Sequence, residues 1–297
     1  MALSRALVIV NPAAGRGRAA RVWQRLRDEH RSVECVLTEA PGHARRLARD
    51  AVARDVERVV VVGGDGTVSE VAGGVAGTRV AVGVVPAGTG NDFSRALGVP
   101  TATGAAARLA LEGPAQWVDL GQARIGERSV AFVNVAGCGF DAEVVRRTSA
   151  APRLGGTLPY LIGIVRTLSA FRPRPMRFHV DGRLLERCSL GVAVANGPRY
   201  GGGMLIAPRA AIDDGLFDIC LIGNVSPVQV LALLPRLYAG THGGHRAVEF
   251  FKCRELRVEP VVSADVSCQA DGELLGEVPV TFSIQPRGLL CVTGHGR

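Results

Sequence analysis

The sequence has few of the features that mark secreted, membrane-spanning or nucleic-acid-binding proteins. Its 7 cysteines stand singly, with no C-x-x-C pair, which argues against a zinc module or a disulfide framework and predicts reduced thiols in a cytoplasmic protein. Aromatic residues make up only 5% of the chain, and no nucleic-acid-binding motif is present. Apolar stretches such as 228–234 fall short of the about 20 residues that a bilayer crossing needs. The opening segment MALSRALVIVNP lacks the pattern of a secretion signal.

Two common phosphate-binding loops are also absent. The chain contains neither G-x-x-x-x-G-K-[ST] nor G-x-G-x-x-G, so the sequence predicts no Walker A loop and no dinucleotide loop of the usual kind. It does contain 38 glycines in 297 residues, and a net charge of +8 that comes almost wholly from arginine. Such a surface suits nucleic acid, an anionic membrane or a phosphorylated ligand, and nothing else in the sequence favours nucleic acid.

The first 120 residues alternate between short buried strands and amphipathic helices. Apolar residues such as Val22 and Leu26 recur at helical spacing. Strands that alternate with helices of about ten residues predict a parallel sheet covered on both faces. The predicted strands are 5–12, 33–39, 57–62 and 80–85, and the predicted helices are 17–30, 43–54, 67–76 and 103–112.

The pattern changes near residue 119 to short strands linked by turns, which predicts a mostly antiparallel β-sandwich. The sequence therefore predicts an α/β protein of two domains, a parallel α/β domain over 1–118 and a β-rich domain over 119–286. The strands of the second domain are expected within 128–140, 176–186, 188–197, 215–223, 251–260, 267–276 and 278–292, with helical pieces at 157–171 and 227–240.

Three glycine-containing turns each follow a predicted strand of the first domain. NPAAGRGRA (11–19) follows the first strand, GGDGT (63–67) the third and PAGTGNDF (86–93) the fourth. Open α/β sheets bind ligands at the carboxyl ends of their strands, so we expect these turns to converge on one crevice. Each alone is more often a simple turn. Together, with the carboxylates and threonine hydroxyls that they carry, they predict a polyphosphate pocket.

These segments resemble the diacylglycerol-kinase catalytic family of lipid kinases, which includes sphingosine and ceramide kinases and bacterial soluble lipid kinases. The resemblance rests on NPAAG, GGDGTVSEV and PAGTGND, and continues in DDGLFDI (213–219) and ADGE (270–273). GGDGT alone is shared with NAD kinases and, more distantly, with phosphofructokinases. The resemblance implies a two-domain fold of the NAD kinase and diacylglycerol kinase type, with residues from about 287 to 297 returning to the first domain. It further implies that ATP binds in the cleft between the domains and phosphorylates the hydroxyl of a lipid such as diacylglycerol.

The resemblance also implies a set of nucleotide contacts. Glycine amides would face the phosphates, threonine hydroxyls would donate to them, and the two asparagines would hold the turns or bind sugar oxygens. Thr38 has an equal alternative as a strand-end hydroxyl that caps the next helix, and Glu70 one as a first-turn acid beside a helix N-terminus. The predicted contacts are Asn11, Gly15, Arg16, Thr38, Gly63, Gly64, Asp65, Gly66, Thr67, Glu70, Gly88, Thr89, Asn91 and, in the second domain, Glu273.

The family match makes Asp271 the general base that takes the proton of the lipid hydroxyl. The plainer interpretation is a hairpin turn, because Asp-Gly is a typical turn pair, here between 267–270 and 278–284. The two roles are compatible.

Magnesium is the metal that the resemblance implies. Asp65, Asp92 and Asp119 would form an Asp–water–magnesium network, and carboxylate oxygens are suitable ligands for Mg²⁺. Asp214 matches a structural magnesium site of bacterial relatives, in which the backbone carbonyls of Ala211 and Leu216 would join it. A plain turn is the alternative for this Asp-Asp-Gly segment.

Three residues depart from those common in the family. Ala14 removes a hydroxyl, Arg16 replaces a lysine without its point geometry, and Ser69 replaces an asparagine. None of them is a carboxylate of the predicted site, so an active kinase is still predicted.

The alternatives are an NAD-kinase-like enzyme and a silent nucleotide-binding regulator. The apolar segments 157–171 and 227–240 suit an acyl chain better than a dinucleotide. A silent regulator would be expected to lose the base.

A lipid substrate requires access to a membrane. The arginine-rich surface predicts weak, reversible attraction to an anionic membrane surface, and a homodimer is compatible with the sequence. Leu158, Leu161, Ile162 and Val165 share one helix face and are predicted to form the entry for the acyl chain, with Arg166 at the head groups. A helix packed on its own domain is the alternative.

Overall fold

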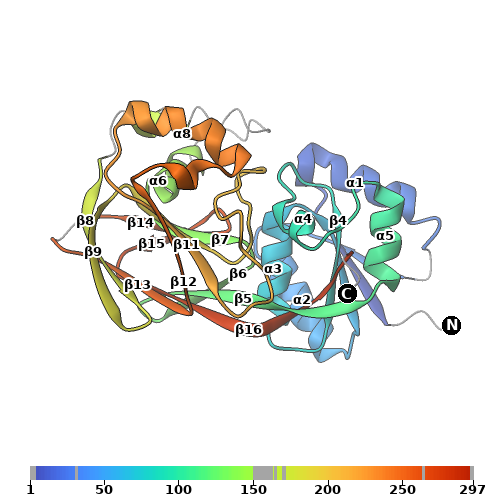
Figure 1. Cartoon of the computed structure of the whole chain (residues 1–297). Coiled ribbons are helices and arrows are strands. Elements are labelled where there is room, and N and C mark those ends of the chain that lie inside the picture. The colour runs from blue at the N-terminus through green and yellow to red at the C-terminus, as the bar shows by residue number, and fades with distance from the viewer. Residues whose placement is uncertain are drawn as a thin grey trace. The chain divides into compact units, whose positions relative to one another are not determined.

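The computed structural model describes residues 5–30, 33–149, 163, 166–168, 172–262 and 265–294. The chain divides into two compact units, which we call the N-terminal unit (Met1–Leu120 with Arg287–Arg297) and the C-terminal unit (Gly121–Pro286). Figure 1 shows that both units contain helices as well as strands. The division falls between residues 120 and 121, against an expected position between 118 and 119.

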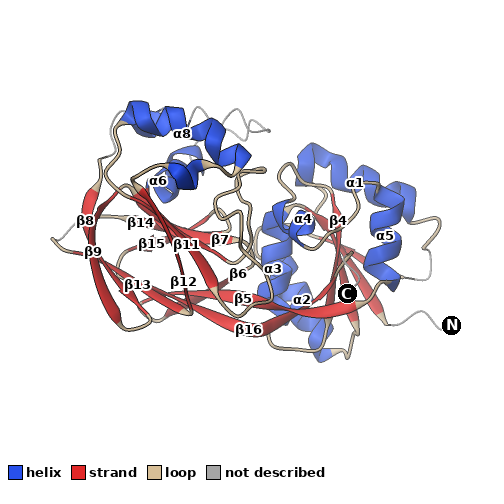
Figure 2. Ribbon diagram, in the orientation of Figure 1, coloured by secondary structure: helices blue, strands red, loops and turns tan. Residues whose placement is uncertain are grey.

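The N-terminal unit is a parallel sheet with helices on its faces (Figure 2). Its strands run in the order β2-β1-β3-β4, and all of these pairings are parallel. Its strands are β1 (Ala6–Val10), β2 (Glu34–Leu37), β3 (Arg58–Gly63) and β4 (Ala81–Pro86), and its helices are α1 (Ala14–Leu26), α2 (His43–Ala53), α3 (Asp65–Val75), α4 (Asp92–Ala96) and α5 (Thr103–Glu112). The valine-rich strands are buried, as expected for a sheet covered on both faces.

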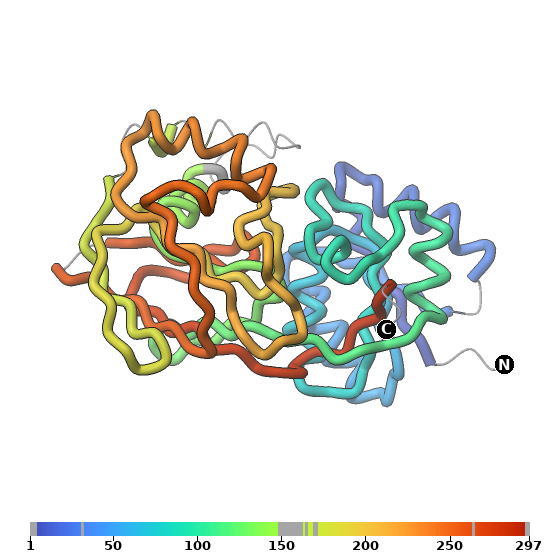
Figure 3. The backbone as a smooth tube through the Cα atoms, in the orientation of Figure 1, coloured from blue at the N-terminus to red at the C-terminus, as the bar shows by residue number. Residues whose placement is uncertain are grey.

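The last strand, β16 (Val280–Val292), returns to the first sheet, as Figure 3 shows in red. Cys291 of β16 pairs in parallel with Val82 of β4. The backbone amide of Gly77 also donates to the carbonyl of Gly288, at 2.8 Å. The end of the chain therefore completes the N-terminal unit.

The C-terminal unit contains two antiparallel sheets. One has β13, β8 and β9 beside the first part of β16, with β5 and β6 also attached, and the other runs β12-β11-β10-β7-β14-β15. The strands are β5 (Ala115–Ile125), β6 (Arg128–Phe132), β7 (Val135–Gly139), β8 (Arg174–Val180), β9 (Arg183–Ser189), β10 (Gly191–Ala195), β11 (Phe217–Ile222), β12 (Val248–Cys253), β13 (Glu255–Pro260), β14 (Ser267–Ala270) and β15 (Glu273–Glu277); the helices are α6 (Phe140–Ser149), α8 (Pro227–Ala239) and the 3₁₀ turn η1 (His242–Gly244).

Aromatic side chains from both sheets form the centre of this core. Phe132 of one sheet stacks on Phe217 of the other with ring centroids 5.6 Å apart, and Phe282 meets Phe132 edge-on at 6.3 Å. All three are fully buried. The predicted sandwich is confirmed by this face-to-face packing.

The differences from the sequence prediction lie mainly at turns and short helices. The expected strand 176–186 is a hairpin, because Asp181 and Gly182 have φ of 46° and 84° and reverse the chain between β8 and β9. The helices α4 and α6 were not predicted. Helix 227–240 is confirmed as α8, whereas Leu158, Leu161, Ile162 and Val165 lie outside the described residues.

No helix in the described part of the chain is long and apolar enough to cross a bilayer.

Candidate active site

The three glycine turns of the N-terminal unit meet at the carboxyl ends of their strands. A Cβ atom on Gly15 would lie 2.1 Å from the carbonyl oxygen of Ala87, and one on Gly88 would lie 2.5 Å from the Cα of Gly64. Real Cβ atoms do not approach other atoms so closely. Glycine is therefore required because the backbones of neighbouring turns touch one another, and the expected convergence of the three turns is observed.

Side chains fasten these turns together. The amide of Asn11 donates to the hydroxyl of Thr67 at 2.9 Å, and the carboxylate of Asp65 accepts the backbone N–H of Phe93 at 3.1 Å. Asn91, at φ 56°, closes its own turn: its side chain accepts from the N–H of Gly88 and donates to the carbonyl of Gly88. In this structure both asparagines hold the turns.

The surface beside these turns suits a polyphosphate. Arg16 and Thr89 are exposed, and the space around the Cα of Gly66 is open, since a Cβ there would meet nothing within 4 Å. Helix α3 begins at Asp65 after Gly64, which provides no side-chain cap. Backbone amides at such a helix start attract phosphate oxygens.

Glu70 and Thr38 lie near a different helix terminus. The two carboxylate oxygens of Glu70 accept the backbone N–H groups of Gly42 and Ala44 at 2.9 and 3.1 Å. Glu70, which belongs to α3, therefore caps the start of α2, whereas the sequence offered it as a first-turn acid beside a helix N-terminus. The N-cap residue of α2 is Gly42, and the structure shows no capping hydrogen bond from the Thr38 hydroxyl there. Nucleotide contact by Thr38 or by Glu70 stays a prediction.

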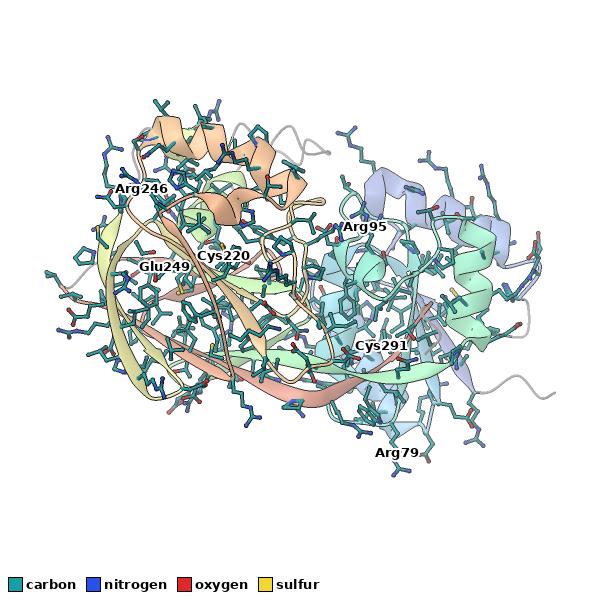
Figure 4. The ribbon with its side chains drawn as sticks, in the orientation of Figure 1. Arg79, Arg95, Cys220, Arg246, Glu249 and Cys291 are labelled. Carbon is teal, nitrogen blue, oxygen red and sulfur yellow. The ribbon has the colours of Figure 1, made fainter. Side chains whose placement is uncertain are left out.

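Two predicted metal carboxylates are deeply buried. Asp92 is 2% exposed and pairs with Arg95 at 2.8 Å (Arg95 is labelled in Figure 4). Asp119 is 1% exposed and accepts the backbone N–H of Arg287 at 2.9 Å, so it fixes the point where the chain re-enters the N-terminal unit. Within the described ranges, no cluster of three or more His, Cys, Asp or Glu side chains is placed to hold a metal ion.

Asp271 lies in the C-terminal unit at the turn between β14 and β15. Asp271 and Gly272 have φ of 47° and 83°, the conformation of a tight hairpin turn. The turn joins β14 to Glu273–Glu277 and not to 278–284 as predicted, because the partner strand follows the turn at once. Glu273 is the first, exposed residue of β15.

Three backbone amides orient the Asp271 carboxylate. Val133 donates to Oδ2 at 2.7 Å, while Asn134 and Val135 donate to Oδ1 at 2.9 and 3.2 Å. These donors come from the segment that leads into β7, so a single segment fixes both oxygens. Oδ1 already accepts two amides, so Oδ2 is the oxygen to which a substrate hydroxyl would give its proton.

Lys252, the only lysine of the chain, meets the predicted structural metal site. Its ammonium lies 2.6 Å from Asp214 and 3.0 Å from Asp218. Asp214 also accepts the backbone N–H of Leu216 at 3.1 Å, as in a plain Asx turn. The cation observed at this carboxylate pair is therefore a side chain.

Replacing Lys252 by methionine should leave Asp214 and Asp218 without their cation. We expect the free energy of unfolding in urea to fall by about 1–3 kcal/mol, as for the loss of hydrogen bonds to charged groups. Lys252→Arg, which keeps the charge, is the control and should lose less. In the absence of nucleotide, Mg²⁺ should stabilise Lys252→Met but not the native protein; stabilisation of the native protein alone would favour the metal site.

Comparison with known proteins agrees with this arrangement. The family model described as "Diacylglycerol kinase catalytic domain" matches residues 5–123, and that described as "YegS C-terminal NAD kinase beta sandwich-like domain" matches residues 134–293. A protein named diacylglycerol kinase from Mycobacterium tuberculosis (strain CDC 1551 / Oshkosh) is 33% identical over 97% of this chain and 94% of its own length. A probable YegS-like lipid kinase from Pseudomonas aeruginosa (strain PAO1) is 32% identical, over 95% of this chain and 92% of its own.

A solved structure shows the same fold. The crystal structure of a putative diacylglycerol kinase from Bacillus anthracis str. Sterne superposes with a TM-score of 0.80 at 25% identity, covering 99% of this chain and 98% of the other. The converging glycine turns, the two-unit fold and these matches along nearly the whole chain lead to one conclusion. The chain belongs to the diacylglycerol kinase catalytic-domain family of lipid kinases.

Proposed function

We propose that this protein transfers the γ-phosphoryl group of ATP to the hydroxyl of a lipid such as diacylglycerol. The observation that carries the proposal is the meeting of three glycine turns at one edge of a parallel sheet. Because the backbones of these turns lie so close together, the groups between them are amides and hydroxyls and not bulky side chains, and such groups can bind phosphates. Phosphoryl transfer needs positioning and charge neutralisation more than covalent chemistry by the protein.

In the proposed reaction Asp271 is the base. Its carboxylate takes the proton of the lipid hydroxyl as that oxygen attacks the γ-phosphorus, and the bond to the bridging oxygen breaks to release ADP. The amides that orient Asp271 hold the accepting lone pairs in one direction. Exposed Arg16 and Thr89 would bind phosphate oxygens.

The carboxylates of the N-terminal unit suit a magnesium ion that keeps most of its waters. Mg²⁺ usually keeps several waters and binds through one or two carboxylates together with substrate phosphates. Asp65, Asp92 and Asp119 would hold it in that manner, largely through water, which agrees with the lack of a preformed three-ligand cluster among the described residues. When bound, the ion would neutralise phosphate charge.

A pocket in the C-terminal unit supports a lipid as the acceptor. Helix α8 lines it with Val230, Leu233, Leu234 and Leu237, and the other walls include Val192 of β10. The empty space bounded by these residues is about 710 Å³, a figure that includes open solvent. An acyl chain suits these apolar walls better than the polar groups of a dinucleotide.

The outer face of α8 is also apolar and is a candidate contact with the membrane. Val228, Leu231 and Tyr238 are 75%, 45% and 37% exposed, although the same helix buries Val230 and Leu233. A bilayer would cover these side chains, and the net positive charge would favour an anionic leaflet. We therefore propose weak, reversible association with anionic membranes.

Replacing Val228 and Leu231 together by aspartate should weaken this association. Each side chain loses the roughly 1.5–3 kcal/mol that full burial of an apolar residue gives, so co-sedimentation with anionic vesicles should fall at least tenfold. Activity on a water-soluble short-chain diacylglycerol should be retained.

Leu184→Asp is the matched control, since Leu184 is 57% exposed and belongs to β9, the end strand of its sheet, and not to α8. Vesicle binding of the double variant equal to that of the control would contradict the role of α8. Binding that ignores salt and lipid charge would contradict the electrostatic part.

The proposed function is tested with labelled ATP and a panel of acceptors. The panel contains diacylglycerols of increasing chain length, a sphingoid base, phosphatidylglycerol, a polyprenol and NAD. Phosphorylation of at least one lipid, and not of NAD, is expected. Phosphorylation of NAD alone would support the NAD-kinase alternative, and nucleotide binding without any transfer would support a regulator.

A further inference from the structure

Gln269 lies two residues before Asp271, and both ends of its side-chain amide form hydrogen bonds. Its amide oxygen accepts the backbone N–H of Gly272 at 2.9 Å, and its amide nitrogen donates to Oδ2 of Asp141 at 3.0 Å. Gln269 is 1% exposed. The oxygen must face Gly272, because that partner is a donor, and this fixes the orientation of the whole amide.

A glycine makes room for this contact. Gly137 of β7 is the cross-strand partner of Gln269, and a Cβ at Gly137 would lie 2.8 Å from Oδ2 of Asp141. Asp141 is in the first turn of α6 and also lines the apolar pocket of the C-terminal unit. The missing side chain at Gly137 thus lets the Asp141 carboxylate reach Gln269.

We propose that Gln269 and Asp141 are positioning residues for the reaction, which hold the turn that carries Asp271. Asp141 fixes the Gln269 amide, and the amide fixes Gly272 beside Asp271. The three amides of the Val133–Val135 segment orient the carboxylate itself, while Gln269 holds the turn from the other side. This inference rests on the proposed function, because Asp271 must be the base.

The chemistry of this link demands one donor and one acceptor at position 269. Methionine has a similar length but offers neither. Glutamate keeps the acceptor toward Gly272 and places a second carboxylate against Asp141. The exchanged pair Asp141→Asn with Gln269→Glu restores an amide and a carboxylate in reversed order, and keeps an acceptor for Gly272.

Because Asp141 is a buried acid, the activity of these variants should depend on pH. Burial raises the pKa of the Asp141 carboxyl, and the hydrogen bond from Gln269 opposes this rise. Titratable groups near it include Cys138 on β7, Cys268 beside Cys138 on β14, and Tyr200 and His242 in the pocket. Burial raises the pKa of Cys138 and lowers that of His242, so these two stay neutral near pH 7. In Gln269→Glu, the two acids must therefore share a proton with each other, which becomes harder as the pH rises.

The experiment compares native protein, Gln269→Met, Gln269→Glu, Asp141→Asn and the exchanged double variant on the lipid that the panel identifies. We expect Gln269→Met to lower kcat about 10- to 100-fold, the scale of a displaced catalytic group, with KM for ATP unchanged. Asp141→Asn keeps one acceptor oxygen and loses the other, so its kcat should lie between those of the native protein and Gln269→Met. Gln269→Glu should lose activity as the pH rises from 6 to 9, and the double variant should recover both rate and pH profile.

A native kcat in Gln269→Met, or a double variant no better than Gln269→Glu, would overturn the proposal. A second readout needs no activity: amide hydrogen exchange of Gly272, measured by NMR relative to Val192 in the sheet core. Gln269→Met should speed exchange at Gly272 at least tenfold and leave Val192 unchanged. If Gly272 is equally protected in the native protein and in Gln269→Met, the proposal is overturned. If native protein phosphorylates no lipid while Gly272 responds as expected, the proposed function fails and the structural link stands.

Discussion

Replacing Asp271 by asparagine is expected to lower kcat by about 10²–10⁴-fold, the contribution of a general base. The affinity for Mg·ATP, measured by calorimetry, should be unchanged, because the substitution alters proton transfer and not the phosphate-binding turns. Asparagine can keep the bonds from Asn134 and Val135, but its NH₂ group cannot accept from Val133. Some loss of stability, about 1 kcal/mol for one hydrogen bond, should therefore accompany the kinetic effect.

The chain contains a matched control for this variant. Asp181 also stands at positive φ before a glycine in a hairpin turn, and its Oδ1 accepts the backbone N–H groups of Arg254 and Glu255 at 3.0 and 2.9 Å. Asp181→Asn keeps Oδ1 and both of these bonds, so it should change the free energy of unfolding and kcat little. Equal kinetic losses in the two variants, or near-native turnover in Asp271→Asn, would remove Asp271 from the role of base.

The likeness of Asp181 and Asp271 also shows what the local sequence can reveal. Both Asp-Gly pairs predict a turn, and both form one with a carboxylate that binds backbone amides. Only the family resemblance separates a structural aspartate from a candidate base. The turn was therefore predictable from local chemistry, but its proposed function was not.

The order of strands and helices in the N-terminal unit was largely predictable, because strand and helix periods differ clearly there. Helix α4 has only five residues, too few for a periodic signal. Helix α6 follows β7 directly, and its first residue, Phe140, continues the apolar run of that strand, so the start of the helix was not predicted.

Contacts between distant residues were the part that the sequence could not predict. Glu70 caps a helix that begins 27 positions earlier, at His43, and Lys252 meets Asp218 because β11 and β12 pair in register. Gln269 was missed although it precedes the ADGE segment closely. In β14, polar Ser267 and Gln269 alternate with Cys268 and Ala270, as in an ordinary half-exposed strand, so the local pattern gave no signal that Gln269 is buried.

Replacing Asp65 by alanine is expected to weaken Mg·ATP binding by roughly 10- to 100-fold, because contacts that involve a charged group contribute about 1.5–3 kcal/mol. Asp65 stands at the start of α3, between the turn at Gly64 and the amide of Phe93. In the proposed function Asp65 acts in binding, before the chemical step, so the effect should appear in calorimetric affinity as well as in KM for ATP.

Alanine also removes the acceptor for the N–H of Phe93, which would loosen the start of α4 as well. Asp65→Asn separates the two effects, since its amide oxygen can still accept from Phe93 while the negative charge is lost. We expect Asp65→Asn to unfold in urea like the native protein and yet to lose most of the Mg·ATP affinity that Asp65→Ala loses. If Asp65→Asn binds Mg·ATP normally, the carboxylate serves only to anchor α4, and the magnesium role falls to Asp92 and Asp119. If both variants bind Mg·ATP normally, the proposal that the three glycine turns bind the nucleotide is contradicted.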